Sequence, residues 1–315
     1  MLGTVRRQNP KLFASLLAGC FGIGVALEAR INGELSAHVG TGIFPAWLET
    51  ITALLLASLL VAFHRPTREA LLRIRREVST GSLPAFTLVG GVFGAIFLTT
   101  QSVTVPIVGV AVFAVGIIAG QTTGSLIIDR LGIGASGIHL ITWQRATAGV
   151  LAVLAVVVGI ANQFQAVGGI VWGALFAFIA GFIVTPQQAI NGRVAIAGRS
   201  PFALAFVNFL GGAIVMTGVS LCGLLFANLR FNDVWGAPWW AYVGGLFGFL
   251  LVSAAAWVVP VLGVFVFTLI SVLGSIGAAL LFDLLLPING NQVGWNLVVS
   301  AAIILLAIAI ARRGS

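Results

Sequence analysis

The sequence predicts an all-α integral membrane protein, in which ten transmembrane helices form two inverted five-helix repeats. Three observations carry this prediction: an apolar composition, ten apolar segments of bilayer-spanning length, and a long internal duplication. Charged residues make up 8% and apolar residues 59% of the 315 residues, and the mean hydropathy is +1.13. Because a soluble domain carries about 25% charged residues, this composition indicates a chain embedded in a lipid bilayer.

The apolar segments follow one another along the chain with short connections. A helix needs about 20 apolar residues to cross a bilayer, and each segment has about that length. Pro106 and Pro260 suit the first turn of a helix, where a missing N–H costs nothing. Tight turns are therefore expected between Gln101 and Pro106 and between Val258 and Val261. The ten expected spans are 12–31, 43–63, 83–103, 106–128, 138–160, 169–190, 201–227, 238–258, 260–282 and 292–311.

The positive charges predict the orientation of these spans. With ten spans, 13 of the 16 Lys and Arg residues fall on one side of the membrane. Short cytoplasmic connections carry an excess of these residues. Only Arg30 and Arg230 fall on the other side, while Arg145 lies inside the fifth span near its basic end. We therefore expect a multi-pass protein of the cytoplasmic (inner) membrane with both termini in the cytoplasm.

The basic residues do not indicate a nucleic-acid partner, although the net charge is +8. They occupy short connections between apolar spans instead of forming one patch, so the lipid bilayer is the expected partner. The connection 64–82 has five arginines opposite Leu71, Leu72 and Ile74. This pattern predicts a basic amphipathic segment that lies on the anionic inner leaflet.

A duplication divides the chain into a first repeat, residues 1–160, and a second repeat, residues 161–315. Residues 90–129 return 154 positions later as residues 244–283, with 13 identities over 40 positions and no gap. Because each unit has an odd number of spans, the second copy enters the membrane in the opposite direction. The first two spans of each half match at an offset of 159. Many identities fall on Gly, Pro and Asp: Gly90/Gly244, Gly91/Gly245, Gly94/Gly248, Pro106/Pro260, Gly109/Gly263, Gly120/Gly274 and Asp129/Asp283.

Two acidic side chains inside the expected spans are the leading functional candidates. An ionisable group in a membrane span costs about 2.5–3.5 kcal/mol to insert, so it usually serves a function. Glu28 lies in the outer third of the first span and Glu49 a turn or two inside the second, at similar depth. Small and polar residues share their helix faces, which indicates that both acids face other helices. The alternative is that each acid is only hydrogen-bonded at a helix interface or lies in a wet outer vestibule.

The corresponding positions of the second half carry amides. A carboxyl group away from water can exchange a proton for a cationic ligand, whereas an amide can only hydrogen-bond a substrate. The functional interpretation is therefore a polar cavity between the halves, in which the carboxyl groups bind protons or cations. The aligned pairs are Glu28/Gln187, Asn32/Asn191 and Glu49/Asn208.

Other polar residues are weaker candidates. Gln121 lies in the fourth span among Gly116, Gly120 and Gly124, so it either lines the cavity or sits beside a helix-packing stripe. Pro186, beside Gln187, could break the sixth span and free carbonyl groups for a ligand, or it could form an ordinary kink.

Arg30 and Glu34 are four residues apart at the outer end of the first span, and a local surface pair is expected. Cys20 and Cys222 lie within apolar runs and are expected to be packed thiols. The three histidines are scattered. We therefore expect no enzyme activity, no cofactor and no metal site.

The pattern resembles the drug/metabolite transporter superfamily, and its YdcZ-like branch most closely, over nearly the whole chain. The residues that carry the resemblance are Ile31-Asn32-Gly33, Gln187-Gln188-Ala189-Ile190-Asn191-Gly192-Arg193, and Gly120-Gln121 leading into Ile128-Asp129. The resemblance implies a ten-helix inner-membrane transporter that works by alternating access. Members of the superfamily's small drug-exporting branch carry an essential glutamate in the first helix. Glu28 is similar in helix, although not in depth.

Three functions are compatible with these features. The first is a transporter or exporter of a small metabolite or organic cation, driven by proton exchange at Glu28. The second is an uncoupled facilitator in which the acids are structural, and the third is a non-transporting membrane scaffold or accessory protein. The first predicts protons as the coupling ion and a small-molecule substrate. A monomer is sufficient because both halves lie in one chain, and a homodimer remains an alternative.

Overall fold

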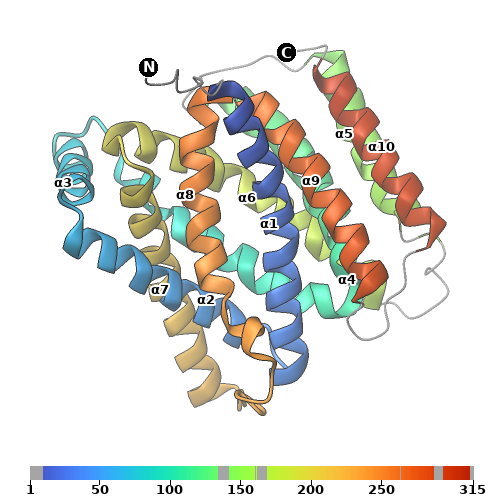
Figure 1. The fold of residues 1–315 in the computed structure, drawn as a ribbon, viewed down its shortest axis with the longest axis horizontal. Coiled ribbons are helices and arrows are strands. Elements are labelled where there is room, and N and C mark those ends of the chain that lie inside the picture. Colours follow the sequence, from blue (N-terminus) through green and yellow to red (C-terminus); the bar gives the residue numbers. More distant parts are fainter. Residues whose placement is uncertain are drawn as a thin grey trace, which may run out of the picture.

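The structure is a computed structural model that describes residues 10–133, 142–159, 161, 169–262, 264–286 and 294–312. Within these ranges the chain is helical and contains no strand. Figure 1 shows α5 and α10 paired at one edge of the bundle and α3 at the opposite edge. The elements are α1 (Pro10–Val39), α2 (Ile43–Phe63), α3 (Arg65–Ser79), η1 (Ala85–Val89), α4 (Gly90–Leu131), α5 (Trp143–Gly159), α6 (Gly169–Gly198), α7 (Pro201–Phe226), η3 (Trp239–Tyr242), α8 (Gly244–Leu262), α9 (Val264–Leu285) and α10 (Trp295–Arg312).

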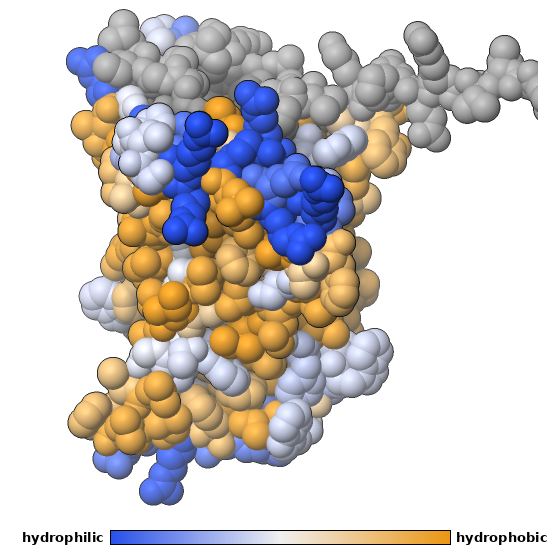
Figure 2. Space-filling model, turned by 90° about the vertical axis from the view of Figure 1, so that its left-hand side faces the viewer, coloured by the Kyte–Doolittle hydropathy of each residue, from blue (hydrophilic) through white to orange (hydrophobic). Residues whose placement is uncertain are grey.

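The surface and the helix lengths are those of an all-helical membrane protein. Among the described residues, five helical segments are long and apolar enough to cross a bilayer: Leu12–Val39, Ile43–Phe63, Ala85–Ile128, Gly169–Gly198 and Pro201–Phe226. Four shorter helical segments, Trp143–Gly159, Gly244–Ala255, Ile270–Leu285 and Trp295–Ile310, are also apolar. Figure 2 shows a broad apolar belt with hydrophilic residues gathered above it and fewer below it. The predicted integral membrane class is therefore confirmed.

Local signals explain where several helices begin and end. Gly40 ends α1 with a φ of 78°, a backbone conformation that glycine adopts without strain. Ser200 caps α7 because its hydroxyl oxygen accepts a hydrogen bond from the Ala203 N–H at 3.3 Å, and Pro201 occupies the first turn.

Helix α4 differs from the prediction of two helices joined by a turn between Gln101 and Pro106. The helix runs through Pro106 and is interrupted three residues later at Gly109, whose φ of 81° and ψ of 168° are not helical. The Asp283 carboxylate accepts hydrogen bonds from the N–H groups of Val110 (2.9 Å) and Ala111 (2.7 Å). These N–H groups are left without helical partners by the break, so Asp283 stabilises it. Helix α8 likewise continues through the turn predicted between Val258 and Val261.

The long helices approach one another closely through glycine. A side chain at Gly22 of α1 would overlap the Ser271 carbonyl oxygen of α9, and one at Gly181 of α6 would overlap the Ile117 carbonyl oxygen of α4. Gly120 of α4 meets the backbone of Phe178 in the same way. Small residues allow such backbone approach in membrane bundles. Backbone contact between helices therefore explains why glycine occupies these positions.

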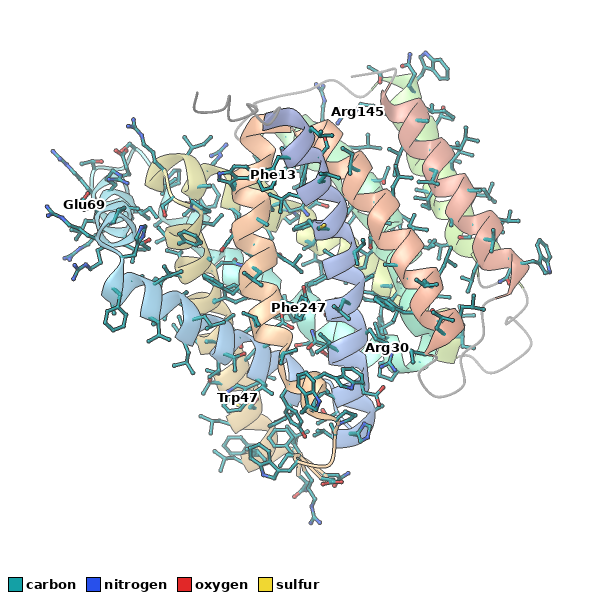
Figure 3. All side chains as sticks on the ribbon, viewed as in Figure 1. Phe13, Arg30, Trp47, Glu69, Arg145 and Phe247 are labelled. Atoms are coloured by element: carbon teal, nitrogen blue, oxygen red, sulfur yellow. The ribbon has the colours of Figure 1, made fainter. Side chains whose placement is uncertain are left out.

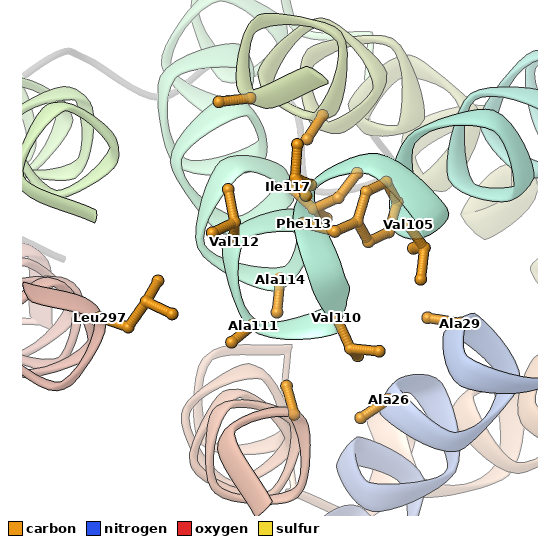
Figure 4. Close-up of a cluster of buried hydrophobic side chains, with 14 of the residues drawn as sticks. Ala26, Ala29, Val105, Val110, Ala111, Val112, Phe113, Ala114, Ile117 and Leu297 are labelled. Carbon is orange, nitrogen blue, oxygen red and sulfur yellow. The ribbon is translucent and has the colours of Figure 1, made fainter. Parts of the chain in front are cut away.

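A core of valine and alanine closes the centre of the bundle around the break in α4. Ala26 and Ala29 of α1 lie against Val105 and Val110 of α4 (Figure 4). Phe113 lies in the same cluster and is 3% exposed. The contact joins the C-terminal half of α1 to the residues on both sides of Gly109.

Helix α3 confirms the predicted basic amphipathic segment. Its buried apolar residues, Ala70 and Ile74, pack against α6 and α7. Leu72, which was expected on the apolar face, is 63% exposed among the arginines. The side chain of Arg73 instead reaches across to the Gly198 carbonyl oxygen at the end of α6, at 3.0 Å.

The expectation that the cysteines are packed is wrong. Cys20 and Cys222 are both exposed free thiols on apolar helices. An apolar sequence context alone does not separate a side chain on the outer surface of the bundle from one packed against a neighbouring helix. Cys20 and Cys222 form no disulfide with each other.

Candidate functional site

The two predicted acids meet inside the bundle. Glu28 of α1 is 6% exposed and Glu49 of α2 is 2% exposed. Their carboxyl groups lie within hydrogen-bonding reach of each other. The prediction that both acids face other helices is therefore confirmed. A hydrogen bond between two carboxyl groups requires that one of them carries a proton, because an ionised carboxylate only accepts.

Asn32 links this pair to a third helix, α4. It lies one turn after Glu28 on the same face of α1, and its side-chain nitrogen donates to Glu49 Oε2 at 2.5 Å. The same nitrogen donates to Gln101 Oε1 of α4 at 3.0 Å. Asn32 is 1% exposed and Gln101 is fully buried. We call Glu28, Asn32, Glu49 and Gln101 the carboxyl cluster.

Sequence reasoning missed Gln101. Its duplicate position in the second half is Ala255, so comparing the repeats gave no reason to select it. The available signal was an amide near the end of the apolar run 83–103, because a polar side chain at membrane depth needs a partner. In the structure that partner is Asn32.

The first turns of α8 cover the carboxyl cluster with glycine. A Cβ atom at Gly248 would lie 2.5 Å from Glu49 Oε1, and one at Gly244 would lie 2.8 Å from Asn32 Oδ1. A side chain at Gly245 would overlap the Thr52 hydroxyl group. The glycines that define the duplication therefore let the α8 backbone pack directly on the polar groups of α1 and α2.

The predicted amides of the second half form an equivalent arrangement, which we call the amide cluster. The side-chain nitrogen of Gln187 on α6 donates to Asn208 Oδ1 on α7 at 3.4 Å. The start of α4 covers them: a Cβ atom at Gly94 would lie 2.8 Å from Gln187 Nε2. A side chain at Gly90 would overlap Asn191 Oδ1. The amide cluster therefore consists of Gln187, Asn191 and Asn208, packed against the glycines of α4.

Two weaker candidates stay outside both clusters. Gln121 is half-buried on α4, and the described contacts do not join it to either cluster. Its neighbour Gly120 packs against α6, as expected for a packing stripe. Pro186 lies inside α6, which continues from Gly169 to Gly198, so it does not break the helix.

Arg30 and Glu34 form the predicted pair, at 2.5 Å, but the pair is not on the surface. Arg30 is 7% exposed because its guanidinium group lies over the Trp240 ring, 5.4 Å from the ring centroid. Its Nε atom also donates to the Leu286 carbonyl oxygen at 3.0 Å, just beyond Asp283. Figure 3 shows Arg30 and Trp47 toward one end of the bundle, and Arg145 and Phe13 toward the other.

The described residues contain no group of three or more His, Cys, Asp and Glu side chains that could hold a metal ion. The fold and the buried clusters define a class: a polytopic helical membrane protein with hydrogen-bonding side chains enclosed between its helices. Such groups inside a membrane domain are typical of substrate and ion pathways.

Comparison with known proteins identifies the family. The model of the family described as "Putative inner membrane exporter, YdcZ" matches residues 13–158 and 172–310. The chain belongs to this family, and it is therefore a multi-pass inner-membrane protein of the transporter class within the drug/metabolite transporter superfamily.

A solved structure described as "Crystal structure of protein" resembles the fold. It has a TM-score of 0.56 and 19% sequence identity, and the match covers 97% of this chain and 99% of that chain. At this level of identity the likeness concerns the fold alone. The search of curated proteins gave no match.

Proposed function

We propose that the protein is a secondary transporter that exports a small metabolite or organic cation in exchange for protons. The single observation that carries the proposal is the contact between the Glu28 and Glu49 carboxyl groups inside an apolar bundle. Keeping two acids there is costly unless they are used. Membership of an exporter family supports the direction of transport.

The chemistry is competition for one site. With one shared proton, the pair carries a single negative charge, which the Asn32 side-chain nitrogen stabilises by its hydrogen bond to Glu49. A monovalent cationic substrate displaces the shared proton, because like charges close together disfavour each other, and the cation with the two ionised carboxylates again carries one net negative charge. The proton-loaded and substrate-loaded forms therefore have the same net charge, whereas the empty site carries two negative charges, so only the two loaded forms permit the reorientation that transport requires.

The two clusters support an architecture of ten spans in two inverted repeats, 1–160 and 161–315. Helix α4 is 42 residues long, enough to cross the bilayer on each side of Gly109. The glycines of α4 cover the amide cluster of the second half, whereas those of α8 cover the carboxyl cluster of the first. Each half therefore covers the polar cluster of the other half, as expected where two related units enclose a shared pathway. Alternating access then exposes the pathway to each side in turn.

The charges support an orientation with both termini in the cytoplasm. Helix α3, which carries five arginines, and Arg145 of α5 lie in the upper half of the view in Figure 3, whereas Arg30 lies in the lower half. In this orientation the carboxyl cluster lies toward the outer side. One chain contains both halves, so a monomer is the proposed working unit.

Proton release on binding tests the proposal. Purified protein in weakly buffered detergent solution, with a pH-sensitive dye, is titrated with a panel of small organic cations. Wild type is expected to release about one proton for each cation bound. Glu28→Gln and Glu49→Gln are expected to bind without release, whereas the exposed control Glu69→Gln on α3 should behave like wild type.

Three results would overturn the proposal. Unchanged proton release in Glu28→Gln and Glu49→Gln would show that the two acids are structural and do not exchange the proton. Binding without proton release in wild type would favour an uncoupled facilitator, for which the amide cluster would supply the solute contacts. A protein that binds no member of the panel would favour the accessory role.

A further inference from the structure

One donor in the carboxyl cluster has no partner. Gln101 is fully buried, and its side-chain nitrogen Nε2 makes no hydrogen bond to the described residues. A buried polar group without a partner is uncommon in native proteins and calls for an explanation. The group lies among the residues proposed to bind the substrate.

The neighbouring contacts determine which end of the Gln101 amide is unsatisfied. Asn32 Nδ2 donates to Glu49 Oε2 and also to Gln101, so the Gln101 atom that faces it must be the oxygen. Exchanging the two ends of the Gln101 amide would place two donors against each other. The unsatisfied group is therefore an N–H donor.

The geometry also limits how far this donor lies from the acids. A single Asn32 nitrogen contacts both Gln101 Oε1 and Glu49 Oε2, so these two oxygens are separated by no more than about two hydrogen-bond lengths, and the Nε2 donor lies on the other branch of the same Gln101 amide. A ligand whose cationic group meets the carboxyl pair would thus have its neighbouring atoms beside the Gln101 amide.

We infer that the Gln101 amide binds an acceptor on the substrate, so that the substrate is an amine with a carbonyl or hydroxyl oxygen close to its nitrogen. This inference rests on the proposed function, because it assumes that the carboxyl pair receives the cationic group. It adds a specificity determinant: the acids select charge, and Gln101 selects the neighbouring oxygen. A site that hydrogen-bonds a substrate atom discriminates against analogues without that atom.

The test compares two amines of similar shape. Alaninamide carries a carbonyl group beside its amine, and 3-methylbutan-2-amine is its hydrocarbon analogue. Binding of each to the purified full-length protein in detergent is measured by calorimetry. Wild type is expected to bind alaninamide about three- to tenfold more tightly than 3-methylbutan-2-amine, which is the difference that one neutral hydrogen bond contributes.

Gln101→Leu should abolish this preference, which is the ratio of the two dissociation constants. Gln188→Leu is the matched control, because Gln188 is an exposed amide on α6, and it should keep the preference. Equal binding of the two amines by wild type would overturn the inference whether or not the variants fold. A preference that persists in folded Gln101→Leu would also overturn it. Failure of wild type to bind either amine would instead count against the proposed function.

Discussion

Removing the Asp283 carboxylate should destabilise the break in α4. This side chain accepts hydrogen bonds from the N–H groups of Val110 and Ala111, at 2.9 and 2.7 Å, from a position at the end of α9. Asp283 is 4% exposed, so water does not replace these bonds readily. Asp283→Asn keeps one acceptor oxygen, turns an amide donor toward the other N–H, and removes the charge that favours a helix N-terminus.

The magnitude follows from these contacts. A hydrogen bond to a charged group contributes about 1.5–3 kcal/mol in soluble proteins, whereas hydrogen bonds between membrane helices average about 0.6 kcal/mol. Losing one bond and weakening the other is therefore expected to cost about 2 kcal/mol for Asp283→Asn. Asp283→Ala leaves two buried N–H groups unpaired and is expected to cost more, about 3–4 kcal/mol.

Unfolding by sodium dodecyl sulfate in mixed micelles, followed by circular dichroism, measures these differences. Asp233→Asn is the matched control, because Asp233 is exposed in the connection before α8, and its free energy of unfolding should change by less than about 0.5 kcal/mol. A change in Asp283→Asn no larger than in this control would refute the assignment of Asp283 as the cap of the broken helix.

Three further predictions concern packing, lipid and orientation. Gly22→Ala should lower the free energy of unfolding by about 1–3 kcal/mol, because the new methyl group overlaps the Ser271 carbonyl group. Gly218→Ala, with open space around it, should be neutral or stabilising in the same assay. Anionic lipid should raise the melting temperature of wild type more than zwitterionic lipid does, and replacing the exposed residues Arg68 and Arg75 with glutamine should reduce this difference. An unchanged difference would exclude α3 as the segment that contacts anionic lipid. A fluorescent reporter that matures only in the cytoplasm should be active when fused to the C-terminus. If this fusion is not fluorescent, and a reporter that is active only in the periplasm works at the same position, the proposed orientation is reversed.

The parts of the fold predicted well from the sequence depend on composition and on local pattern. Apolar runs gave the membrane class, and the five arginines of 64–82 gave the amphipathic helix α3. The break in α4 was placed too early because Pro106 is acceptable at a helix start and also inside a kinked membrane helix. The structure places the break at Gly109, which tolerates a positive φ, and supplies its cap from α9, more than 170 residues away in sequence.

The candidate site could also be predicted only in part, because sequence patterns show single residues within a segment and not the contacts between segments. Glu28 and Glu49 are unusual at membrane depth, so each was visible in its own segment, and the repeats pointed to Gln187, Asn191 and Asn208. Which groups touch depends on how the helices cross, and periodicity does not contain that information. Gln101 joins the acids from a third helix, and Arg30 is buried by Trp240 of a distant segment.

Substrate-driven proton movement across a membrane tests the central claim most directly. The purified protein is reconstituted into liposomes that contain a pH-sensitive dye, and a small organic cation that binds the protein is added outside. The account predicts a proton flux opposite to the cation in wild type and in Glu69→Gln, and none above that of protein-free liposomes in Glu28→Gln. Cation uptake that proceeds equally in wild type and Glu28→Gln without proton movement would contradict proton exchange at the carboxyl pair.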